Sequence, residues 1–156
     1  MGLQSKNSIR KGDILIIYTD GASRKNPGHS AISFIFLKDG SSKPFTKHSE
    51  YIGIKTNNEA EYIAIIKALE EARSYTRWKI KVYSDSQLVI NQINGNWRIK
   101  KEYLAELFKD VKEASMFFDQ VEFFHVSREN QFIKICDKLC NDELDKVEGK
   151  NDNKNA

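Results

Sequence analysis

The sequence of 156 residues contains only two cysteines, Cys136 and Cys140, which are too few for a disulfide framework or a cysteine-based zinc site. Their spacing would place them one turn apart on a helix, so we interpret both as reduced thiols of an intracellular protein. The chain also lacks an apolar stretch long enough for a signal peptide or a membrane span. We therefore expect a soluble, cytoplasmic protein that makes no membrane contact.

The sequence also lacks a strong excess of charge of either sign. Its 25 basic and 22 acidic residues give a formal net charge of +3, far from the basic field of a protein that coats nucleic acid. Charge alone therefore identifies no partner. The length and the hydrophobic content of 40% suit one domain, without internal repeat or linker. We assign residues 12–146 to this domain, and we expect flexible termini over 1–11 and 147–156 and a monomer.

Hydrophobic periodicity predicts an alternation of strands and helices. Apolar runs rich in β-branched residues indicate strands, and apolar positions three to four residues apart indicate helices. The strands are expected over residues 13–20, 31–38, 45–52, 79–84 and 121–126, and the helices over 57–75, 86–94, 101–114 and 132–147. Residues 21–28 are expected to form a loop, and Thr56 with Glu59 fits a capping box. This order requires a mixed sheet covered by helices, which is an α/β fold.

Two acidic residues, Asp20 and Asp85, each stand just beyond the carboxyl end of a predicted strand, where α/β domains collect ligands. If the two strands are neighbours, the carboxylates converge. At an effective dielectric constant of about 20, two such charges about 4 Å apart repel by roughly 4 kcal/mol, so the cluster needs a counter-ion. Hard divalent cations such as Mg²⁺ supply it, and carboxylates without His or Cys partners indicate phosphoryl transfer. Alternatively, each Asp forms a turn or, at Asp85, caps the helix that follows.

Four motifs cover the chain from Tyr18 to Asn141. They are YTDGASRKNPG, TNNEAEYIAIIKAL, YSDSQLVINQING and HVSREN…CDKLCN, in that order. The set resembles the motifs of ribonuclease HI proteins, in the subgroup without a long basic protrusion. The resemblance implies a ribonuclease H-like mixed five-stranded sheet flanked by helices. It also implies an endoribonuclease that hydrolyses the RNA strand of RNA/DNA hybrids and leaves 5′-phosphate and 3′-hydroxyl ends.

The resemblance maps four catalytic, metal-binding carboxylates onto Asp20, Glu61, Asp85 and Asp137. It implies two Mg²⁺ ions per site, with Mn²⁺ as a substitute. Asp20 would bridge both ions, Asp137 would share the ion that activates water, and Glu61 and Asp85 would hold the other ion.

Two of these positions have a rival. Glu59 competes with Glu61, because both lie in the first helical turn, and only the resemblance selects Glu61. Asp137 follows a longer interval than the family pattern has, and Asp142 is the less favoured alternative to it.

The resemblance also implies contacts to the hybrid duplex. Minor-groove and sugar contacts map onto Asn26, Asn57, Asn58 and Gln87, and phosphate contacts onto Arg98, Lys100 and Lys101. Each has a local alternative: Asn26 suits a turn, Asn57 suits a helix cap, and a run of Arg and Lys is commonly a solvated surface.

A histidine near the fourth motif assists proton transfer or product release in many family members. Here His125 ends a predicted strand, where a histidine is more often structural, and Arg128 and Glu129 are alternatives between which the sequence does not choose. Two other functions stay open: a catalytically silent hybrid-binding module, and a related nuclease that acts on DNA junctions or within a retroelement.

Overall fold

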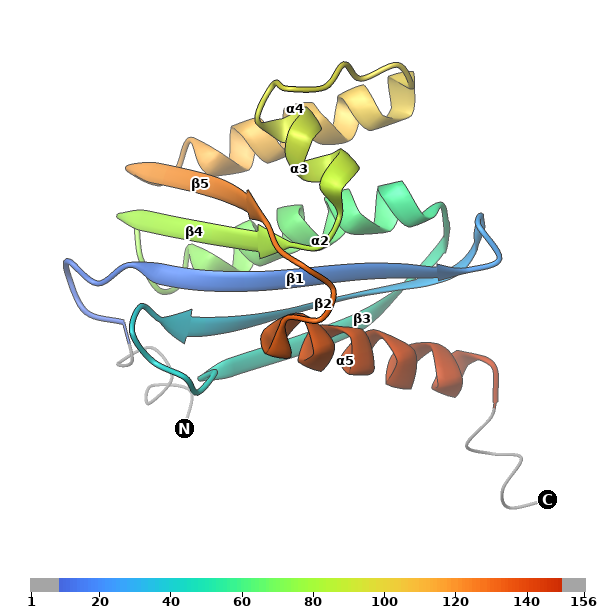
Figure 1. Ribbon diagram of the computed structural model, residues 1–156, viewed down its shortest axis with the longest axis horizontal. Helices are drawn as coiled ribbons and strands as arrows, with labels where there is room; N and C mark the ends of the chain where they lie inside the picture. Colours follow the sequence, from blue (N-terminus) through green and yellow to red (C-terminus); the bar gives the residue numbers. More distant parts are fainter. Residues whose placement is uncertain (1–8, 150–156) are drawn as a thin grey trace.

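The computed structural model describes residues 9–149, and its centre is one five-stranded sheet in the order β3-β2-β1-β4-β5 (Figure 1). The strands are β1 (Leu15–Arg24), β2 (Gly28–Lys38), β3 (Thr46–Lys55), β4 (Lys79–Ser84) and β5 (Gln120–His125). β2 pairs antiparallel with β1 and β3, whereas β4 pairs parallel with β1 and β5. The prediction of a mixed five-stranded sheet is confirmed. Of the flexible termini predicted over 1–11 and 147–156, residues 1–8 and 150–156 lie outside the described residues.

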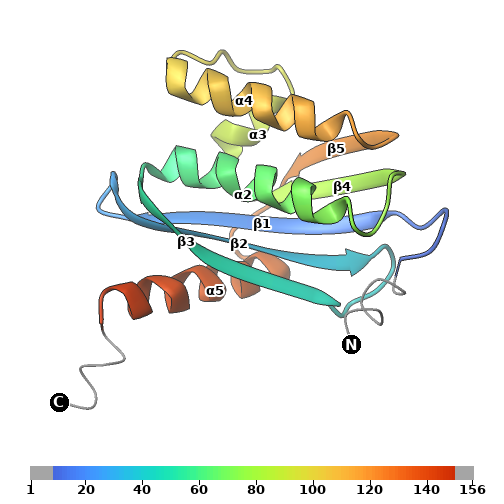
Figure 2. The ribbon, with the colours of Figure 1, turned by 180° about the vertical axis from the view of Figure 1, so that it is seen from behind.

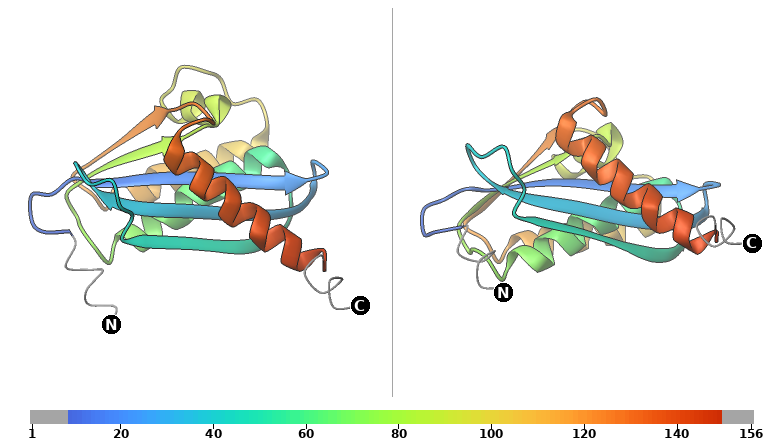
Figure 3. Two further views of the ribbon diagram at one scale, coloured as in Figure 1. Left: turned by 60° about the horizontal axis from the view of Figure 1, so that its bottom comes forward. Right: turned by 90° about the horizontal axis from the view of Figure 1, so that it is seen from below.

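Helices cover both faces of the sheet. They are α2 (Asn57–Ala72), α3 (Gln87–Ile93), α4 (Glu102–Ser115) and α5 (Gln131–Val147). α2, α3 and α4 lie on one face, and α5 lies alone on the other (Figure 2), where it runs obliquely across β1, β2 and β3 (Figure 3). None of these helices is long and apolar enough to cross a membrane.

Alternation along the strands divides the buried residues between two apolar layers. On β1, Leu15 and Ile17 join the layer beneath α2 and α4, whereas Ile16 joins the layer beneath α5. Cys136 and Cys140 are free, as expected, and both are buried residues of α5. Burial raises the pKa of both thiols, so they act as small apolar side chains.

The predicted loop over residues 21–28 is too long, because only residues 25–27 form the turn between β1 and β2. β1 continues to Arg24 because its residues from Asp20 onward keep antiparallel partners on β2, from Asp20 opposite Ser33 to Arg24 opposite His29. These pairs satisfy backbone groups that a loop would leave to water. Asp20 therefore lies inside a strand and not beyond its end. The parallel ladder with β4 stops one residue earlier, at Thr19, so Asp20 still stands at the edge of the parallel part of the sheet.

The predicted capping box at the start of α2 is confirmed. The Oγ1 of Thr56 accepts a hydrogen bond from the backbone N–H of Glu59 (3.1 Å), and the Oε1 of Glu59 accepts one from the N–H of Thr56 (2.9 Å). The Glu59 carboxylate is thus used to begin the helix. Glu61 stands two residues later, about 200° around the helix axis, and faces another part of the molecule.

Candidate active site

Three carboxylates from three elements meet at one edge of the sheet. Asp20 lies on β1, Glu61 in the first turns of α2, and Asp85 directly after β4, and each offers an oxygen within 4.8 Å of the others. Asp20 is only 5% exposed, and the other two are partly buried. Because β1 and β4 are parallel neighbours, residues that follow the end of their ladder are brought together at the same edge.

Gly21 brings Glu61 to this edge. A Cβ at Gly21 would overlap the backbone carbonyl of Ala60 and lie 2.6 Å from the backbone nitrogen of Glu61. The N–H of Gly21 donates a hydrogen bond to the Oε1 of Glu61 (3.1 Å). The missing side chain therefore lets α2 approach β1 closely enough for the two carboxylates to meet. Sequence reasoning placed Gly21 in a motif but gave it no role.

The alternative that Asp85 caps α3 is wrong. The N-cap of α3 is Ser86, whose hydroxyl accepts a hydrogen bond from the N–H of Val89 (3.3 Å). The N–H of Ser86 in turn donates to the Oγ of Ser84 (3.0 Å), which fixes the backbone between β4 and α3. The side chain of Asp85 is therefore not needed for the helix and joins the carboxylate cluster.

The cluster carries unbalanced negative charge. Burial, together with the charges of Asp85 and Asp137, raises the pKa of Asp20 to about 8. Burial, with the charges of Asp20 and Asp85, raises the pKa of Glu61 well above its ordinary range. Burial also raises the pKa of Asp85, against the opposing charge of Arg128. Within residues 9–149, no Lys or Arg forms an ion pair with these carboxylates. Closely spaced carboxylate oxygens without a cationic partner fit a hard divalent cation.

Removal of divalent cations is expected to make stability strongly dependent on pH. The pKa of Asp20 rises from the ordinary value of 3.8 to about 8 on folding, so the folded state holds a proton that the unfolded state releases. The metal-free protein should therefore be most stable below about pH 4 with respect to this group and lose that stability as the pH rises to about 8. Mg²⁺ should raise the melting temperature more at about pH 9 than at about pH 5, because it replaces the proton.

Melting curves across this pH range, recorded with excess chelator and with Mg²⁺, measure the effect. Asp142→Asn is the matched control, since Asp142 is exposed and pairs with Lys138 (3.0 Å) away from the cluster. The control should show the same dependence of melting temperature on pH as the parent protein. An equal Mg²⁺ effect at both ends of the range would contradict a shared cation site.

Asp137 stands beside the cluster and not inside it. It lies exposed on α5, outside the group of three whose oxygens are within 4.8 Å, yet its charge contributes to the raised pKa of Asp20. The start of α5 is fixed by Asn130, whose side chain accepts hydrogen bonds from the N–H groups of the second and third helical residues. The rival of Asp137, Asp142, points to Lys138 on the outer surface.

A cavity of about 510 Å³ opens beside the carboxylates. Its lining consists of Asn57, Asn58, Glu61, Asp85, Ser86, His125, Ser127 and Arg128. The lining therefore includes two of the predicted substrate-binding residues, Asn57 and Asn58, and two of the predicted catalytic residues, Glu61 and Asp85. Glu129 points elsewhere and pairs with Lys134 (3.1 Å), whereas His125 and Arg128 border the cavity.

Two of the three asparagines that were expected to contact substrate, Asn26 and Asn57, also brace the backbone. The Oδ1 of Asn26 accepts from the N–H of Asn57 (2.9 Å), and the Oδ1 of Asn57 accepts from the N–H of Ser23 (2.9 Å). The hairpin between β1 and β2 is thereby tied to the start of α2. Asn57 is not the helix cap, which is Thr56. With their oxygens engaged, both amide groups have N–H donors left for a ligand.

The predicted basic residues lie on the connection between α3 and α4, where Arg98, Lys100 and Lys101 are all exposed. A buried pair of polar side chains, absent from the sequence predictions, holds this connection. The hydroxyl of Tyr62 on α2 donates to the Oε1 of Gln92 (2.8 Å), and the Nε2 of Gln92 donates to the carbonyl of Arg98 (3.4 Å). The helix that carries the Glu61 carboxylate is thus linked to the basic connection.

Comparison with known proteins places this geometry in one family. Residues 18–142 match the model of the Reverse transcriptase-like family. Ribonuclease HI of Halobacterium salinarum is 36% identical over 135 residues, which cover 86% of this chain and 66% of that protein. Ribonuclease H of Caldicellulosiruptor saccharolyticus is 33% identical over 115 residues, which cover 72% of this chain and 76% of that protein.

Solved structures agree with the sequence relatives. RNase H1 of Halobacterium salinarum superposes with a TM-score of 0.80 at 34% identity, over 85% of this chain and 98% of the other. LC11-RNase H1, solved in complex with an RNA/DNA hybrid, superposes with a TM-score of 0.79 at 33% identity, over 85% and 98%. Some curated relatives are longer: the chain spans 66% of the Halobacterium protein and 35% of a bifunctional Mycobacterium tuberculosis protein that is 30% identical over 84% of this chain.

Proposed function

This chain belongs to the ribonuclease H proteins of the Reverse transcriptase-like family, and we propose that it is an endoribonuclease that hydrolyses the RNA strand of RNA/DNA hybrids. The family membership inferred from the four motifs is confirmed. The observation that carries the proposal is the cluster of Asp20, Glu61 and Asp85 within 4.8 Å beside an open, polar cavity. The hybrid bound to a structural relative supports the class of substrate.

The proposed site would hold two Mg²⁺ ions, or Mn²⁺ in their place, between the three clustered carboxylates, with Asp137 as a further ligand. Bound ions would activate a water molecule and stabilise charge on the phosphate, which would leave 5′-phosphate and 3′-hydroxyl ends. The residues of the chain hold the carboxylates in position. Asp20 is held rigidly inside β1, and the N–H of Gly21 fixes the Glu61 carboxylate beside it. Catalysis of phosphoryl transfer depends mainly on such positioning and on charge.

Amide side chains around the cavity would recognise the hybrid. Asn57 and Asn58 border the cavity, and Asn26 and Gln87 lie at the adjoining hairpin and at the first turn of α3. We propose that their N–H groups donate to 2′-hydroxyls and base edges in the minor groove.

Two further side chains at the cavity have proposed roles in the reaction. Arg128 borders the cavity and would contact a phosphate near the scissile bond, and its charge already acts on Asp85. The exposed His125 borders the same cavity and would exchange protons with departing product.

One gel separates this activity from its alternatives. End-labelled RNA/DNA hybrid, double-stranded RNA and a DNA junction are each incubated with the protein in Mg²⁺, in Ca²⁺ and in excess chelator. We expect cleavage of the RNA strand of the hybrid in Mg²⁺ only, because Ca²⁺ coordinates too loosely to place water and phosphate. Cleavage in chelator would exclude the metal mechanism. Cleavage of the junction alone would identify a junction nuclease, and binding without cleavage would identify a silent module.

The basic connection is expected to set affinity and not turnover. For a few phosphate contacts the slope of log affinity against log salt concentration should be about −3 to −4, at roughly −0.9 per contact. Lys100→Ala and Lys101→Ala should each make the slope shallower by somewhat under one unit and raise KM with kcat nearly unchanged. These contacts are remote from the carboxylates and serve the ground state and the transition state alike.

Titration of the protein with hybrid in chelator, at several salt concentrations, measures the slope. Lys109→Ala is the matched control, because Lys109 is an exposed lysine on α4 and its substitution removes the same charge from the helix that follows the connection. An unchanged slope in the double variant Lys100→Ala/Lys101→Ala would assign the connection to ordinary surface.

A further inference from the structure

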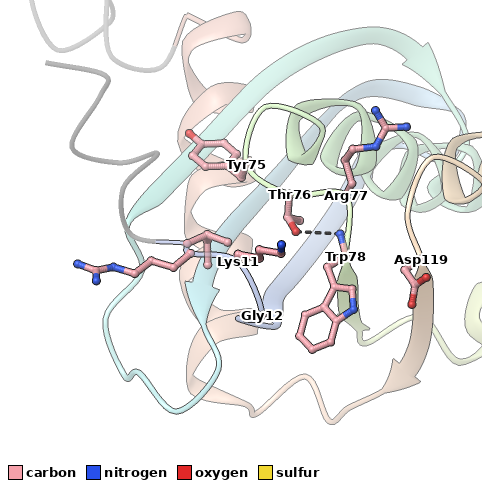
Figure 4. A pocket seen from close by; sticks show the side chains of 9 residues that line it. Lys11, Gly12, Tyr75, Thr76, Arg77, Trp78 and Asp119 are labelled. Carbon is pink, nitrogen blue, oxygen red and sulfur yellow. Dashed lines mark hydrogen bonds between the residues drawn. The ribbon is translucent and has the colours of Figure 1, made fainter.

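A second and larger cavity, of about 660 Å³, lies at the opposite end of the sheet (Figure 4). It lies where the chain enters β1, where the connection between α2 and β4 ends, and where β5 begins. We call it the distal pocket, and its lining consists of Ile9, Arg10, Lys11, Gly12, Tyr75, Thr76, Arg77, Trp78 and Asp119. None of these residues belongs to the carboxylate cluster or to its cavity.

The distal pocket is well separated from the carboxylates. Gly12 precedes β1, and the five positions from Leu15, at the start of β1, to Asp20 alone span roughly 16 Å at about 3.3 Å per residue. Trp78 immediately precedes β4, whereas Asp85 immediately follows it. A ligand in the distal pocket would therefore leave the active site free.

The charged residues of the lining are mostly basic. They are the three cations Arg10, Lys11 and Arg77 and the single carboxylate Asp119. None of these three cations forms an ion pair in the part of the chain from 9 to 149. The guanidinium of Arg77 lies 4.3 Å from the centre of the Phe117 ring, a contact that holds the side chain without neutralising its charge. Cations that the protein itself does not neutralise favour an anionic ligand.

Trp78 gives the pocket an aromatic wall. Its side chain is 37% exposed, and the Nζ of Lys79 lies 4.9 Å from the centre of one ring face. Trp78 lines the cavity, whereas Lys79 does not. The ring faces the same opening as Lys11 and Thr76 (Figure 4). A flat ring beside uncompensated cations is the arrangement that stacks a nucleobase and holds its phosphate.

The wall is also held rigidly. The backbone N–H of Trp78 donates to the Oγ1 of Thr76 (2.9 Å). The carbonyls of Arg77 and Trp78 accept hydrogen bonds from the N–H groups of Asp119 (2.8 Å) and Gln120 (3.2 Å), which join this segment to the start of β5. A ligand would therefore meet a preformed surface, with little ordering to oppose its binding.

We propose that the distal pocket binds single-stranded nucleic acid, with one base stacked on Trp78 and the flanking phosphates on Lys11, Arg77 and Arg10. An acidic peptide would satisfy the cations but would gain little from the flat aromatic wall, so the base is the better match. The inference goes beyond the proposed function, because neither the carboxylates nor the cleavage reaction enters it. In the presence of hybrid, the strand held here would be a single-stranded extension of the same substrate.

Quenching of Trp78 fluorescence tests the proposal directly. Trp97→Phe leaves Trp78 as the one tryptophan of the chain, and the titrant is single-stranded DNA of about ten nucleotides, a typical site size. All titrations contain chelator, so no hydrolysis occurs. We expect saturable quenching that weakens with salt. In an anisotropy assay with labelled DNA, Trp78→Ala should weaken binding about tenfold, and Trp78→Phe less.

The charge reversal Lys11→Glu/Arg77→Glu should weaken binding by more than tenfold, whereas Lys109→Glu/Lys146→Glu, which makes the same change of net charge on α4 and α5, should weaken it far less. The reversed variant should keep wild-type cleavage of blunt-ended hybrid, so failure of the pocket and failure of the proposed function give different results. A mononucleotide that quenches as strongly as the oligonucleotide would overturn the proposal and assign the pocket to free nucleotides. An oligonucleotide that fails to quench, equal binding of a polyglutamate peptide, or equal weakening by Lys109→Glu/Lys146→Glu would each overturn it as well.

Discussion

Asp20→Asn protein is expected to fold and to lose hydrolysis of the hybrid by about a thousandfold or more. The substitution keeps the size of the side chain and removes the charge that stands at the centre of the cluster, within 4.8 Å of Glu61 and Asp85. Because ionised Asp20 is unfavourably buried, the variant should melt at a higher temperature than the parent in chelator, near or above neutral pH. Single-turnover cleavage and melting curves measure the two effects.

The order of effects among the carboxylates tests the geometry further. Glu61→Gln and Asp85→Asn should resemble Asp20→Asn, whereas Asp137→Asn should be the mildest, since Asp137 is exposed and lies outside the group of three. The control substitution Asp142→Asn should leave cleavage unchanged. A folded Asp20→Asn protein with near-wild-type turnover would remove the proposed site from consideration.

Strands and helices whose hydrophobic residues recur with a short period could be predicted well from the sequence. The alternation in β4 and the helical spacing in α2 each report a face that is buried against a neighbour, and such burial repeats along the chain. The end of β1 could not be predicted in this way, because residues 21–24 are rich in small and polar side chains. Their strand conformation comes from pairing with β2, a contact between segments that no local pattern encodes.

The site was predictable only where a residue type was tied to the end of an element or to a motif. Asp85 could be placed after a strand, but its freedom from the helix cap depends on the hydroxyl of Ser86. Periodicity could not separate Glu59 from Glu61, and the structure separates them because Glu59 is used in the capping box. The distal pocket was not predicted, since its residues come from three segments far apart in the sequence.

Gly21→Ala is expected to cost about 3 kcal/mol or more of unfolding free energy, although it adds only one methyl group. The new Cβ would overlap the backbone of Ala60, and a backbone cannot move aside as a flexible side chain can. Relief requires α2 to move away from β1, and this would open a layer in which side chains such as Leu69 are fully buried. The same movement would separate Glu61 from Asp20, so hydrolysis should fall with stability.

Urea unfolding measures the stability change, and Gly40→Ala is the matched control. Gly40 has φ +88° and no atom within 4 Å of the added Cβ, so that substitution introduces backbone strain of about 1–2 kcal/mol without a clash. It should leave cleavage per folded molecule unchanged, because the turn after β2 is far from the carboxylates. If the folded fraction of Gly21→Ala protein cleaved hybrid at the parent rate, the close approach of β1 and α2 would not be what positions Glu61. A loss of cleavage per folded molecule, seen for Gly21→Ala and not for Gly40→Ala, would instead show that the close packing of β1 against α2 positions Glu61 for catalysis.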